Sequence, residues 1–302
     1  MVTRNCSTVF STVPSPERRA DVSRHSQSIL VIGVKYRAER EAERYLESLR
    51  GLQGEQQLTI LVVDNTLGGR WFPHFTDPRF TTISVGTNLG YFGGARYGLS
   101  WYLRHNPLPD WVIVSNVDLA IPNPRFFDGL EGLASIPDLG VVAPRIRSVM
   151  TGVDQNPFMT VRPSAKRMHK YKWLFRHWLL LNAYEGLGWL YRRFRGSLRS
   201  SSSRQAARET IYAPHGSFLM FSRHYFERGG DLHFPEFLFG EEIYVAESVR
   251  RLGLRVVYDP SLVVIHQEHR STKLFKSREI AAYVARSAKY CADTYFPMMS
   301  KT

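Results

Sequence analysis

The clearest candidate for chemistry is an acid at the end of an apolar run, in the segment SNVDLAIPNP. Asp118 follows the residues WVIVSNV, and a carboxylate in such surroundings loses solvation unless it is paired or binds a cation. A carboxylate there could hold a divalent ion such as Mg²⁺ or Mn²⁺ against a diphosphate. The alternative is a turn aspartate that caps a helix after Pro124. Spacing alone leaves both interpretations open.

Two adjacent acids, Glu241 and Glu242, stand where the segment FGEEIYVAESVRRLG predicts the start of a helix. Acids at a helix start interact favourably with the helix dipole. A carboxylate that projects into a pocket would instead be a good general base for a hydroxyl group. Arg250, about two turns further on, could pair with an acid or a phosphate. His266 ends the apolar run SLVVIHQ, where a lone histidine is either structural or a ligand.

A glycine-rich segment, GTNLGYFGGARYG, spans residues 86–98 and predicts a loop between a strand and a helix. Glycines let backbone amides approach a phosphate or a ribose, and a helix N-terminus favours anions. The spacing is neither the dinucleotide fingerprint nor a Walker loop. A nucleotide could still bind here, with Arg96 offsetting phosphate charge.

The elements that must position these residues alternate along the chain. Buried strands are predicted at 28–34, 58–65, 80–85, 110–118 and 139–146, and two short ones at 254–260 and 261–267. Helices are predicted at 39–50, 91–105, 241–252 and about 276–295. This alternation indicates βαβ units and a mostly parallel sheet.

Polar side chains gather where these strands end. In an open parallel sheet, ligands bind at the carboxyl ends of the strands. The residues at these ends are Lys35, Tyr36, Asp64, Asn65, Asn88, Asn116 and Asp118. Turn formation explains any one of them, but it explains the whole set less well.

Composition limits the class of protein. With 302 residues, 43% hydrophobic and 22% charged, the chain suits one large α/β domain and not a disordered protein. Cys6 and Cys291 suggest neither a disulfide framework nor a zinc site, which fits a reducing cytosol. The sequence has no apolar run long enough for a signal peptide or a membrane span, so we expect a cytoplasmic protein.

The net charge of +13 is concentrated in one segment, because residues 162–208 hold twelve Lys or Arg and only one acid. We interpret residues 154–208 as a basic aromatic helical insert and residues 1–27 as a flexible tail. Both halves of the insert could form amphipathic helices that lie on an anionic membrane surface. The alternatives are a helical hairpin packed on the core, or a surface for a partner subunit or an anionic acceptor.

Taken in order, these motifs resemble the inverting family 2 glycosyltransferases, and among them the rhamnosyltransferase-like group. The resemblance covers residues 28–271 outside the insert and rests on VVDN, NLGYFGGARYG, SNVD, PHGSFLMFSR, GEE and VIHQEHRS. It implies that residues 28–302 form a GT-A domain, a Rossmann-like αβα sandwich, with a C-terminal helix within 272–302.

The resemblance also implies residue roles on the donor side. The base and ribose of a nucleotide sugar would lie at Lys35, Tyr36, Asp64 and Asn65. The ribose and diphosphate would lie at Asn88 and Gly90, near Arg96 and Asn116. Asp118 stands at the metal-binding acid of a DxD-like element, and His266 matches a histidine that supplements metal or diphosphate binding. This element reads Asn-Val-Asp here, so Asp118 alone supplies a carboxylate.

On the acceptor side, the resemblance places His215 and Gly216 in the sugar and acceptor pocket, with Arg250 nearby. Glu242 falls on the position of the catalytic base. The family's usual acid pair is Glu-Asp, whereas this chain reads Glu-Glu, so Glu241 remains a competitor for that role. The implied reaction is a metal-dependent direct displacement at the anomeric carbon, with inversion.

The expected substrates follow from the resemblance as well. The donor would be dTDP-rhamnose, or a UDP-sugar as the runner-up. The acceptor would be a hydroxyl of a glycan or lipid-linked saccharide in cell-surface polysaccharide synthesis. We therefore expect a peripheral protein at the inner face of the membrane.

The sequence also bears on three other functions. A nucleotidyltransferase would carry a Gly-rich basic loop after the first strand, where this chain reads VKYRAERE. A nucleic-acid-binding protein would explain the basic charge but not the acids at the strand ends, so no nucleic-acid partner is expected. A catalytically inactive sugar-nucleotide-binding relative stays possible on the sequence alone.

Overall fold

A computed structural model describes residues 26–69, 71, 73, 75–184, 186, 207–267 and 277–298 of the chain. In this part of the chain, nine strands form one sheet. Its first half consists of four strands that run parallel in the order β3, β2, β1, β4. Their bounds are Ser28–Lys35 (β1), Gln57–Asp64 (β2), Phe80–Ser84 (β3) and Trp111–Asn116 (β4). All four were predicted from their apolar runs.

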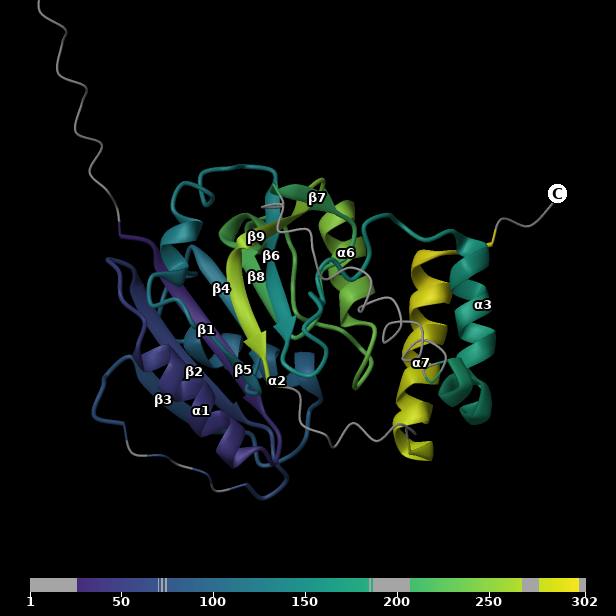
Figure 1. Ribbon diagram of the computed structural model, residues 1–302, viewed down its shortest axis with the longest axis horizontal. Helices are drawn as coiled ribbons and strands as arrows, with labels where there is room; N and C mark the ends of the chain where they lie inside the picture. The colour runs from purple at the N-terminus through teal and green to yellow at the C-terminus, as the bar shows by residue number, and fades with distance from the viewer. Residues whose placement is uncertain are drawn as a thin grey trace, which may run out of the picture.

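The second half of the sheet is mixed. Its bounds are Leu119–Ala120 (β5), Leu139–Ser148 (β6), Glu209–Ile211 (β7), Phe218–Ser222 (β8) and Arg255–His266 (β9). The central strand β8 runs antiparallel to both β4 and β6. Strands β6 and β9 are parallel to each other, whereas the short β5 and β7 pair antiparallel with β9. The long strands are thus mostly parallel, as predicted (Figure 1).

Strand β9 corrects the sequence interpretation, which divided it into two short strands. It is one 12-residue strand whose register against β6 shifts, so that Pro144 faces Asp259 and Arg145 faces Val263. The Asp259 carboxylate accepts hydrogen bonds from the backbone and side chain of Ser261. These bonds stabilise the bulge, so β9 continues past Pro260 to His266 at the edge of the site.

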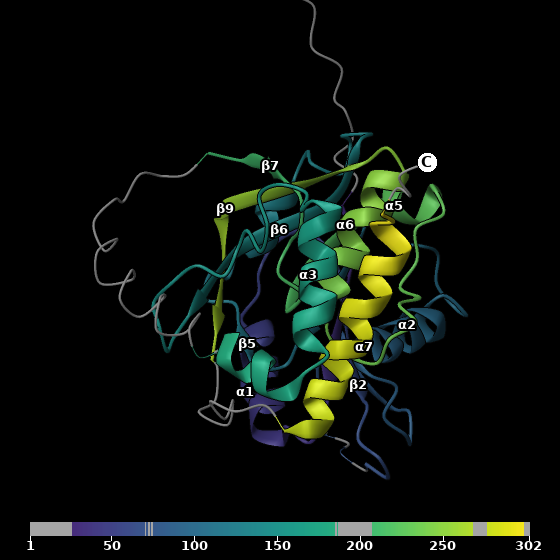
Figure 2. The ribbon, with the colours of Figure 1, turned by 90° about the vertical axis from the view of Figure 1, so that its right-hand side faces the viewer.

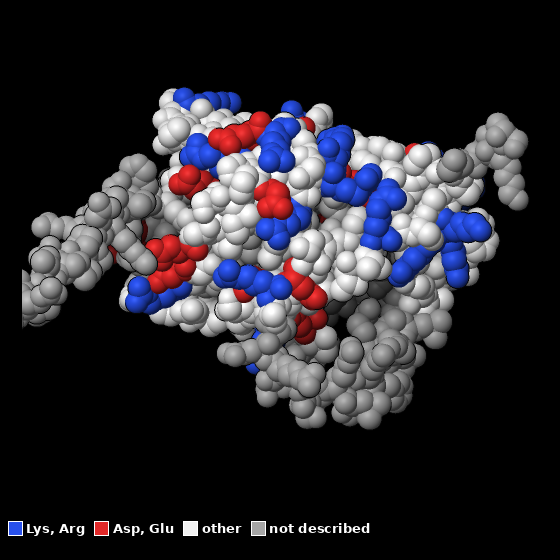
Figure 3. Space-filling model, turned by 90° about the horizontal axis from the view of Figure 1, so that it is seen from above, with Lys and Arg blue, Asp and Glu red and all other residues white. Residues whose placement is uncertain are grey.

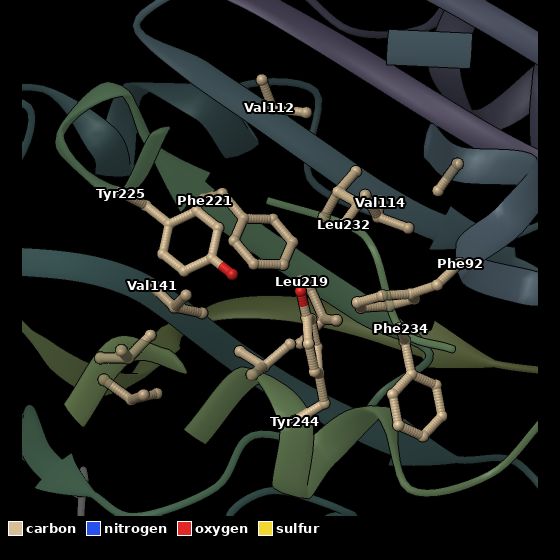
Figure 4. Packing of buried hydrophobic residues seen from close by; sticks show 14 of the residues in the cluster. Phe92, Val112, Val114, Val141, Leu219, Phe221, Tyr225, Leu232, Phe234 and Tyr244 are labelled. Carbon is tan, nitrogen blue, oxygen red and sulfur yellow. The ribbon is translucent and has the colours of Figure 1, made fainter. Parts of the chain in front are cut away.

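The sheet is covered on both faces, which makes an αβα sandwich. Alternate residues of β1 enter opposite core clusters, for example Leu30 on one face and Val31 on the other. Helix α1 (Glu39–Arg50) and the 3-10 helix η1 (Phe126–Leu130) cover one face. Helices α2 (Tyr91–Tyr102), α5 (Arg223–Glu227) and α6 (Glu241–Arg251) cover the other, where Phe92, Phe221 and Tyr244 interlock (Figure 4).

Two further helices lie side by side at the margin of the sandwich. Helix α3 (Ala165–Phe175) belongs to the basic insert, and α7 (Arg278–Tyr295) is the predicted C-terminal helix. They pack together in both ribbon views (Figures 1 and 2). Lys172 Nζ lies 2.5 Å from Asp293 Oδ1, and His169 Nε2 lies 2.9 Å from the Phe296 carbonyl oxygen.

Within the described part of the insert, α3 therefore packs on α7 and is followed by a short helix over residues 178–184, whereas residues 154–164 are not helical. Most of the second half of the insert, with the basic residues Arg192, Arg193 and Arg195, lies outside the described residues, as do residues 1–25 of the expected tail. No helix within the described ranges is long and apolar enough to span a bilayer.

Candidate active site

The glycine-rich loop is held by two asparagine side chains. Asn65 Oδ1 accepts a hydrogen bond from the Leu89 backbone N–H at 3.0 Å, and Asn65 Nδ2 donates to the Gly90 carbonyl oxygen at 2.8 Å. Asn88 Oδ1 accepts from the Gly90 N–H at 3.0 Å. Gly90 has a φ of 75°, and a Cβ there would collide with the Phe237 carbonyl oxygen. The loop geometry therefore requires glycine at this position.

The residues predicted to hold the nucleotide base form a buried ion pair. Lys35 and Asp64 are both fully buried, and Lys35 Nζ lies 3.1 Å from Asp64 Oδ1. Strand register makes them partners, because Lys35 on β1 stands opposite Asp64 on β2. Asp64 also accepts hydrogen bonds from the backbone N–H groups of Thr66 and Trp71. The pair thus shapes the loop after β2, whereas the neighbouring Tyr36 is exposed.

Asp118 and His266 come together at the ends of β4 and β9. His266 Nε2 lies 3.2 Å from Asp118 Oδ2, and His266 Nδ1 lies 2.7 Å from Gln155 Oε1. The other carboxylate oxygen, Asp118 Oδ1, is buried and has no hydrogen-bond partner. An unpartnered buried carboxylate oxygen beside an imidazole nitrogen suits a divalent metal ion. Asp118 and His266 are two side chains, and the described residues contain no cluster of three or more His, Cys, Asp or Glu side chains that could hold a metal ion.

His215 borders this pair, with its ring centroid 6.3 Å from that of His266. Burial, together with the charge of His266, lowers the pKa of His215 to about 4, so the ring is neutral at pH 7. The Ser217 backbone N–H donates to His215 Nδ1 at 3.3 Å, which leaves the ring proton on Nε2. Asn156 Oδ1 accepts from the His215 backbone N–H and fixes the turn.

Both predicted base candidates lie at the N-terminus of α6. Glu241 Oε1 accepts a hydrogen bond from the Phe239 backbone N–H at 3.1 Å. Burial, and then the neighbouring Glu242, raise the pKa of Glu241 to about 8. Burial also raises the pKa of Glu242, against the opposing effect of hydrogen bonds from the Gly216 and Gly240 backbone. A Cβ at Gly216 would lie 2.9 Å from Glu242 Oε1, so the two predicted residues are in contact.

Tyr91 is close enough to both groups of acids for their charges to affect its pKa, and it was not among the predicted site residues. Its hydroxyl is 3.4 Å from the Ser217 carbonyl oxygen. Burial, with the nearby charges of Glu241, Asp118 and Glu242, raises the pKa of Tyr91 well above its usual value. The sequence feature that could have identified Tyr91 as a site residue is its position directly after Gly90, at the start of α2.

Gln155 and Asn156 were also missed, because they open a segment that we interpreted by its charge. Their side chains hold the two site histidines, His266 and His215, respectively. Asp154 fixes the start of the same turn, since its carboxylate accepts from the Ile146 and Asn156 N–H groups.

Three of the predicted residues are not brought to this centre. Arg250 pairs with Glu247, its Nη2 3.0 Å from Glu247 Oε2, so its guanidinium turns from Glu242. Arg96 is exposed on α2. Asn116 contributes its backbone, since its N–H donates to the Ser217 carbonyl oxygen at 2.9 Å.

Known proteins similar to this chain are glycosyltransferases. No family model matches the sequence. An N-acetylglucosaminyl-diphospho-decaprenol L-rhamnosyltransferase, present in the CDC 1551 and H37Rv strains of Mycobacterium tuberculosis, is 27% identical over 274 residues. The alignment covers 88% of this chain and 84% of that enzyme.

The fold comparison agrees. A crystal structure of GalNAc-T7 with UDP, GalNAc and Mn²⁺ aligns with a TM-score of 0.52 and 11% identity, over 87% of this chain and 48% of that one. This likeness shows the GT-A fold. With the sandwich topology, it confirms the predicted GT-A fold, and the similarity to the rhamnosyltransferase supports the glycosyltransferase activity that the motifs predicted.

Proposed function

We propose that this protein transfers a sugar, rhamnose in the first instance, from a nucleoside-diphosphate donor to a hydroxyl of a lipid-linked saccharide, with inversion. One arrangement carries the proposal: Asp118 pairs with His266, Glu242 lies against Gly216, and the charges of both Asp118 and Glu242 act on the same residue, Tyr91. The similar mycobacterial enzymes support this choice, because their name specifies an L-rhamnosyl group and a diphospho-decaprenol acceptor.

On the donor side, Asp118 and His266 are the residues that would hold Mg²⁺ or Mn²⁺. Such an ion, when bound, stabilises the charge that develops on a departing diphosphate. Because the described residues offer two ligands here, diphosphate oxygens and water would supply further coordination. The first-turn N–H groups of α2 have no side-chain cap, so they can also face an anion.

The nucleoside would lie at the carboxyl ends of β1, β2 and β4. Exposed Tyr36 offers a ring at this edge. Asn65 and Asn88 would act by shaping the glycine-rich loop, and the Lys35–Asp64 pair by fixing the loop after β2. The neutral His215 presents an N–H donor at Nε2 on the sugar side.

On the acceptor side, Glu242 would take the proton of the attacking hydroxyl group. A bond then forms between the acceptor oxygen and the anomeric carbon, while the bond from that carbon to the phosphate oxygen breaks. The nucleoside diphosphate leaves with the electron pair. Glu242 lies against Gly216, and protonated Glu241, whose pKa is raised to about 8 chiefly by burial, would keep a second negative charge out of the site.

A membrane-bound acceptor fits the exposed face of α3. Lys166, Lys170, Trp173 and Arg176 are exposed at helical spacing, and Trp173 is 61% exposed. Leu179, in the following short helix, is 71% exposed. Viewed from above, Lys and Arg side chains gather toward the α3–α7 side of the molecule (Figure 3). Clustered cations beside an indole and a leucine suit an anionic lipid surface, so we propose peripheral attachment there.

A direct test is transfer from radiolabelled dTDP-rhamnose to a polyprenyl-diphospho-N-acetylglucosamine in detergent micelles, with Mn²⁺ present. We expect a labelled lipid product whose new linkage has the opposite anomeric configuration to the donor, as read by NMR. Nucleotide binding without any product on a panel of dTDP- and UDP-sugars would favour a catalytically inactive relative. Transfer with retention would contradict the proposed displacement.

A further inference from the structure

The segment that precedes the catalytic carboxylates, residues 237–240, follows one face of α7. The ring of Phe237 lies 4.8 Å from the ring of Tyr283. Ser287 Oγ donates to the Leu238 carbonyl oxygen at 2.7 Å. Cys291 Sγ lies 3.8 Å from the Gly240 carbonyl oxygen. Positions 283, 287 and 291 recur every four residues, so one stripe of α7 supports the whole segment.

Phe239 is unusual within this segment. Its φ is 69°, a left-handed conformation that side chains other than those of Gly, Asn and Asp rarely adopt. Its ring packs against a separate apolar cluster of Leu181, Ala281 and Val284, where α7 meets the helical insert. Its backbone N–H donates to Glu241 Oε1. One residue therefore links the α7–insert layer to a catalytic-site carboxylate.

The same segment also reaches the donor side. The Phe237 carbonyl oxygen occupies the space where a Cβ of residue 90 would stand, so the segment closes directly on the glycine-rich loop. Gly240, with a φ of 90°, then begins α6 and contributes backbone contact to Glu242. A displacement of residues 237–240 would move both carboxylates and open the contact at Gly90.

We infer that Phe239 is a positioning residue: its ring, anchored between α7 and the insert, holds a left-handed backbone whose N–H groups place Glu241 and, next to it, Glu242. The inference rests on the proposed role of Glu242 as the base. It assigns to the insert a task besides membrane contact, because the ring's anchor includes Leu181 of the insert. A misplaced base lowers the rate of the chemical step more than it lowers donor binding.

The test compares Phe239→Asn with Phe239→Leu in the full chain. Asn tolerates the left-handed backbone but has no apolar anchor, whereas Leu keeps an anchor in the cluster. Nucleotide release from dTDP-rhamnose, with Mn²⁺ and a polyprenyl-diphospho-N-acetylglucosamine acceptor present, gives kcat and KM at a temperature well below melting. We expect Phe239→Asn to lower kcat at least about tenfold with the donor KM within about threefold of wild type, and Phe239→Leu to recover most of kcat.

Trp178→Leu is the matched control, since Trp178 packs in the same cluster from the insert without belonging to residues 237–240. We expect it to lower the melting temperature and to keep wild-type kcat. Equal loss of melting temperature in Phe239→Asn and Trp178→Leu, with wild-type kcat in both, would overturn the inference.

If Phe239→Asn does not fold, a second variant tests the same inference. Val284→Ala trims the α7 side of the same contact and leaves the segment itself unchanged. We expect it to lower kcat about threefold or more, and an unchanged kcat overturns the inference. An active Glu242→Gln enzyme would instead refute the proposed base, so the two failures are distinguishable.

Discussion

Asp118 Oδ2 lies 3.2 Å from His266 Nε2, although 148 residues separate them along the chain. Gln155 Oε1 lies 2.7 Å from His266 Nδ1 and so holds the ring from its other nitrogen, while the second oxygen of the carboxylate, Asp118 Oδ1, is buried without a hydrogen-bond partner. This pairing, at the carboxyl ends of the parallel strands, is the strongest structural support for a metal-assisted transfer.

The first prediction concerns this pair. Asp118→Asn keeps the shape of the side chain but removes its charge, and its buried Oδ1 loses the character of a metal ligand. We expect Mn²⁺ affinity, measured by the loss of the free-ion EPR signal, to fall on the order of 10-fold or more, with donor turnover falling as well. Circular dichroism should show an unchanged fold. Near-normal turnover of the variant in saturating Mn²⁺ would contradict the assignment.

The second prediction concerns the base. Glu242→Gln preserves the contact with Gly216 and removes the proton acceptor, so we expect kcat for transfer to fall on the order of 10²- to 10⁴-fold. Donor binding, followed by calorimetry with dTDP-rhamnose, should stay within a few-fold of wild type. If Glu241→Gln is the inactive variant and Glu242→Gln the active one, the two roles must be exchanged.

The third prediction is a pH dependence of stability. The pKa of Glu241 rises from 4.5 to about 8 in the folded protein, chiefly through burial. Below about pH 4.5, Glu241 holds its proton in both the folded and the unfolded protein. Between pH 4.5 and about pH 8, the unfolded chain has lost this proton while the folded protein still holds it. The free energy of unfolding therefore decreases as the pH rises, by up to about 1.4 kcal/mol per pH unit.

Glu241→Gln removes this proton linkage and keeps an acceptor for the Phe239 N–H. We expect the variant to match wild type near pH 5 and to exceed it by a few kcal/mol at pH 8, in urea unfolding at both pH values. An equal stability difference at the two pH values would show that the carboxyl group does not titrate as its burial implies.

The fourth prediction concerns Gly90. Its φ of 75° and the Phe237 carbonyl oxygen beside it leave no room for a methyl group. Gly90→Ala should shift the loop that Asn65 and Asn88 hold, and weaken donor binding by at least about tenfold. Gly132→Ala is a matched control, because Gly132 also has a positive φ but open space around it. Equal donor affinity of the two variants would contradict the role of the loop.

The fifth prediction concerns the α3 face. Replacing Lys166, Lys170 and Arg176 with Gln should weaken sedimentation with vesicles of phosphatidylglycerol and phosphatidylcholine. At about 1 kcal/mol for each cation, the loss is on the order of 10²-fold, and high salt should release the wild type.

The matched control replaces Arg40, Arg44 and Arg104 with Gln, which removes the same charge from exposed positions outside the insert. It should bind the vesicles nearly as well as the wild type, and both variants should release nucleotide at the wild-type rate when the acceptor is supplied in detergent micelles. Equal loss of binding in the two variants would mean that the total charge acts, and not the α3 face.

Much of this fold follows from local sequence patterns. Continuous apolar runs identify the parallel strands, because a strand buried on both faces needs apolar residues throughout. The division of β9 into two strands was wrong because Pro260 usually ends a strand, whereas the Asp259–Ser261 bonds let the strand bulge and continue. The renewed pairing of β9 with β6 after the bulge depends on the register of the two strands, which the sequence does not specify.

The site was predictable where side chains stand at strand ends, as Asp118 and His266 do. Pairings across strands were not predictable, because the contact between Lys35 and Asp64 becomes apparent only from the register of β1 and β2. Gln155 and Asn156 carry no motif and act through the histidines that they orient. Arg250 is different, because Glu247 stands three residues before it, a spacing that predicts an ion pair within the helix.

The measurement that bears most directly on the central claim is nucleotide release from dTDP-rhamnose by the full chain, with a polyprenyl-diphospho-N-acetylglucosamine present, in Mn²⁺ and in EDTA. The account predicts that release depends on the acceptor, stops in EDTA, and is lost in both Asp118→Asn and Glu242→Gln. Release that persists unchanged in EDTA and in both variants would contradict a transfer centred on Asp118, His266 and Glu242.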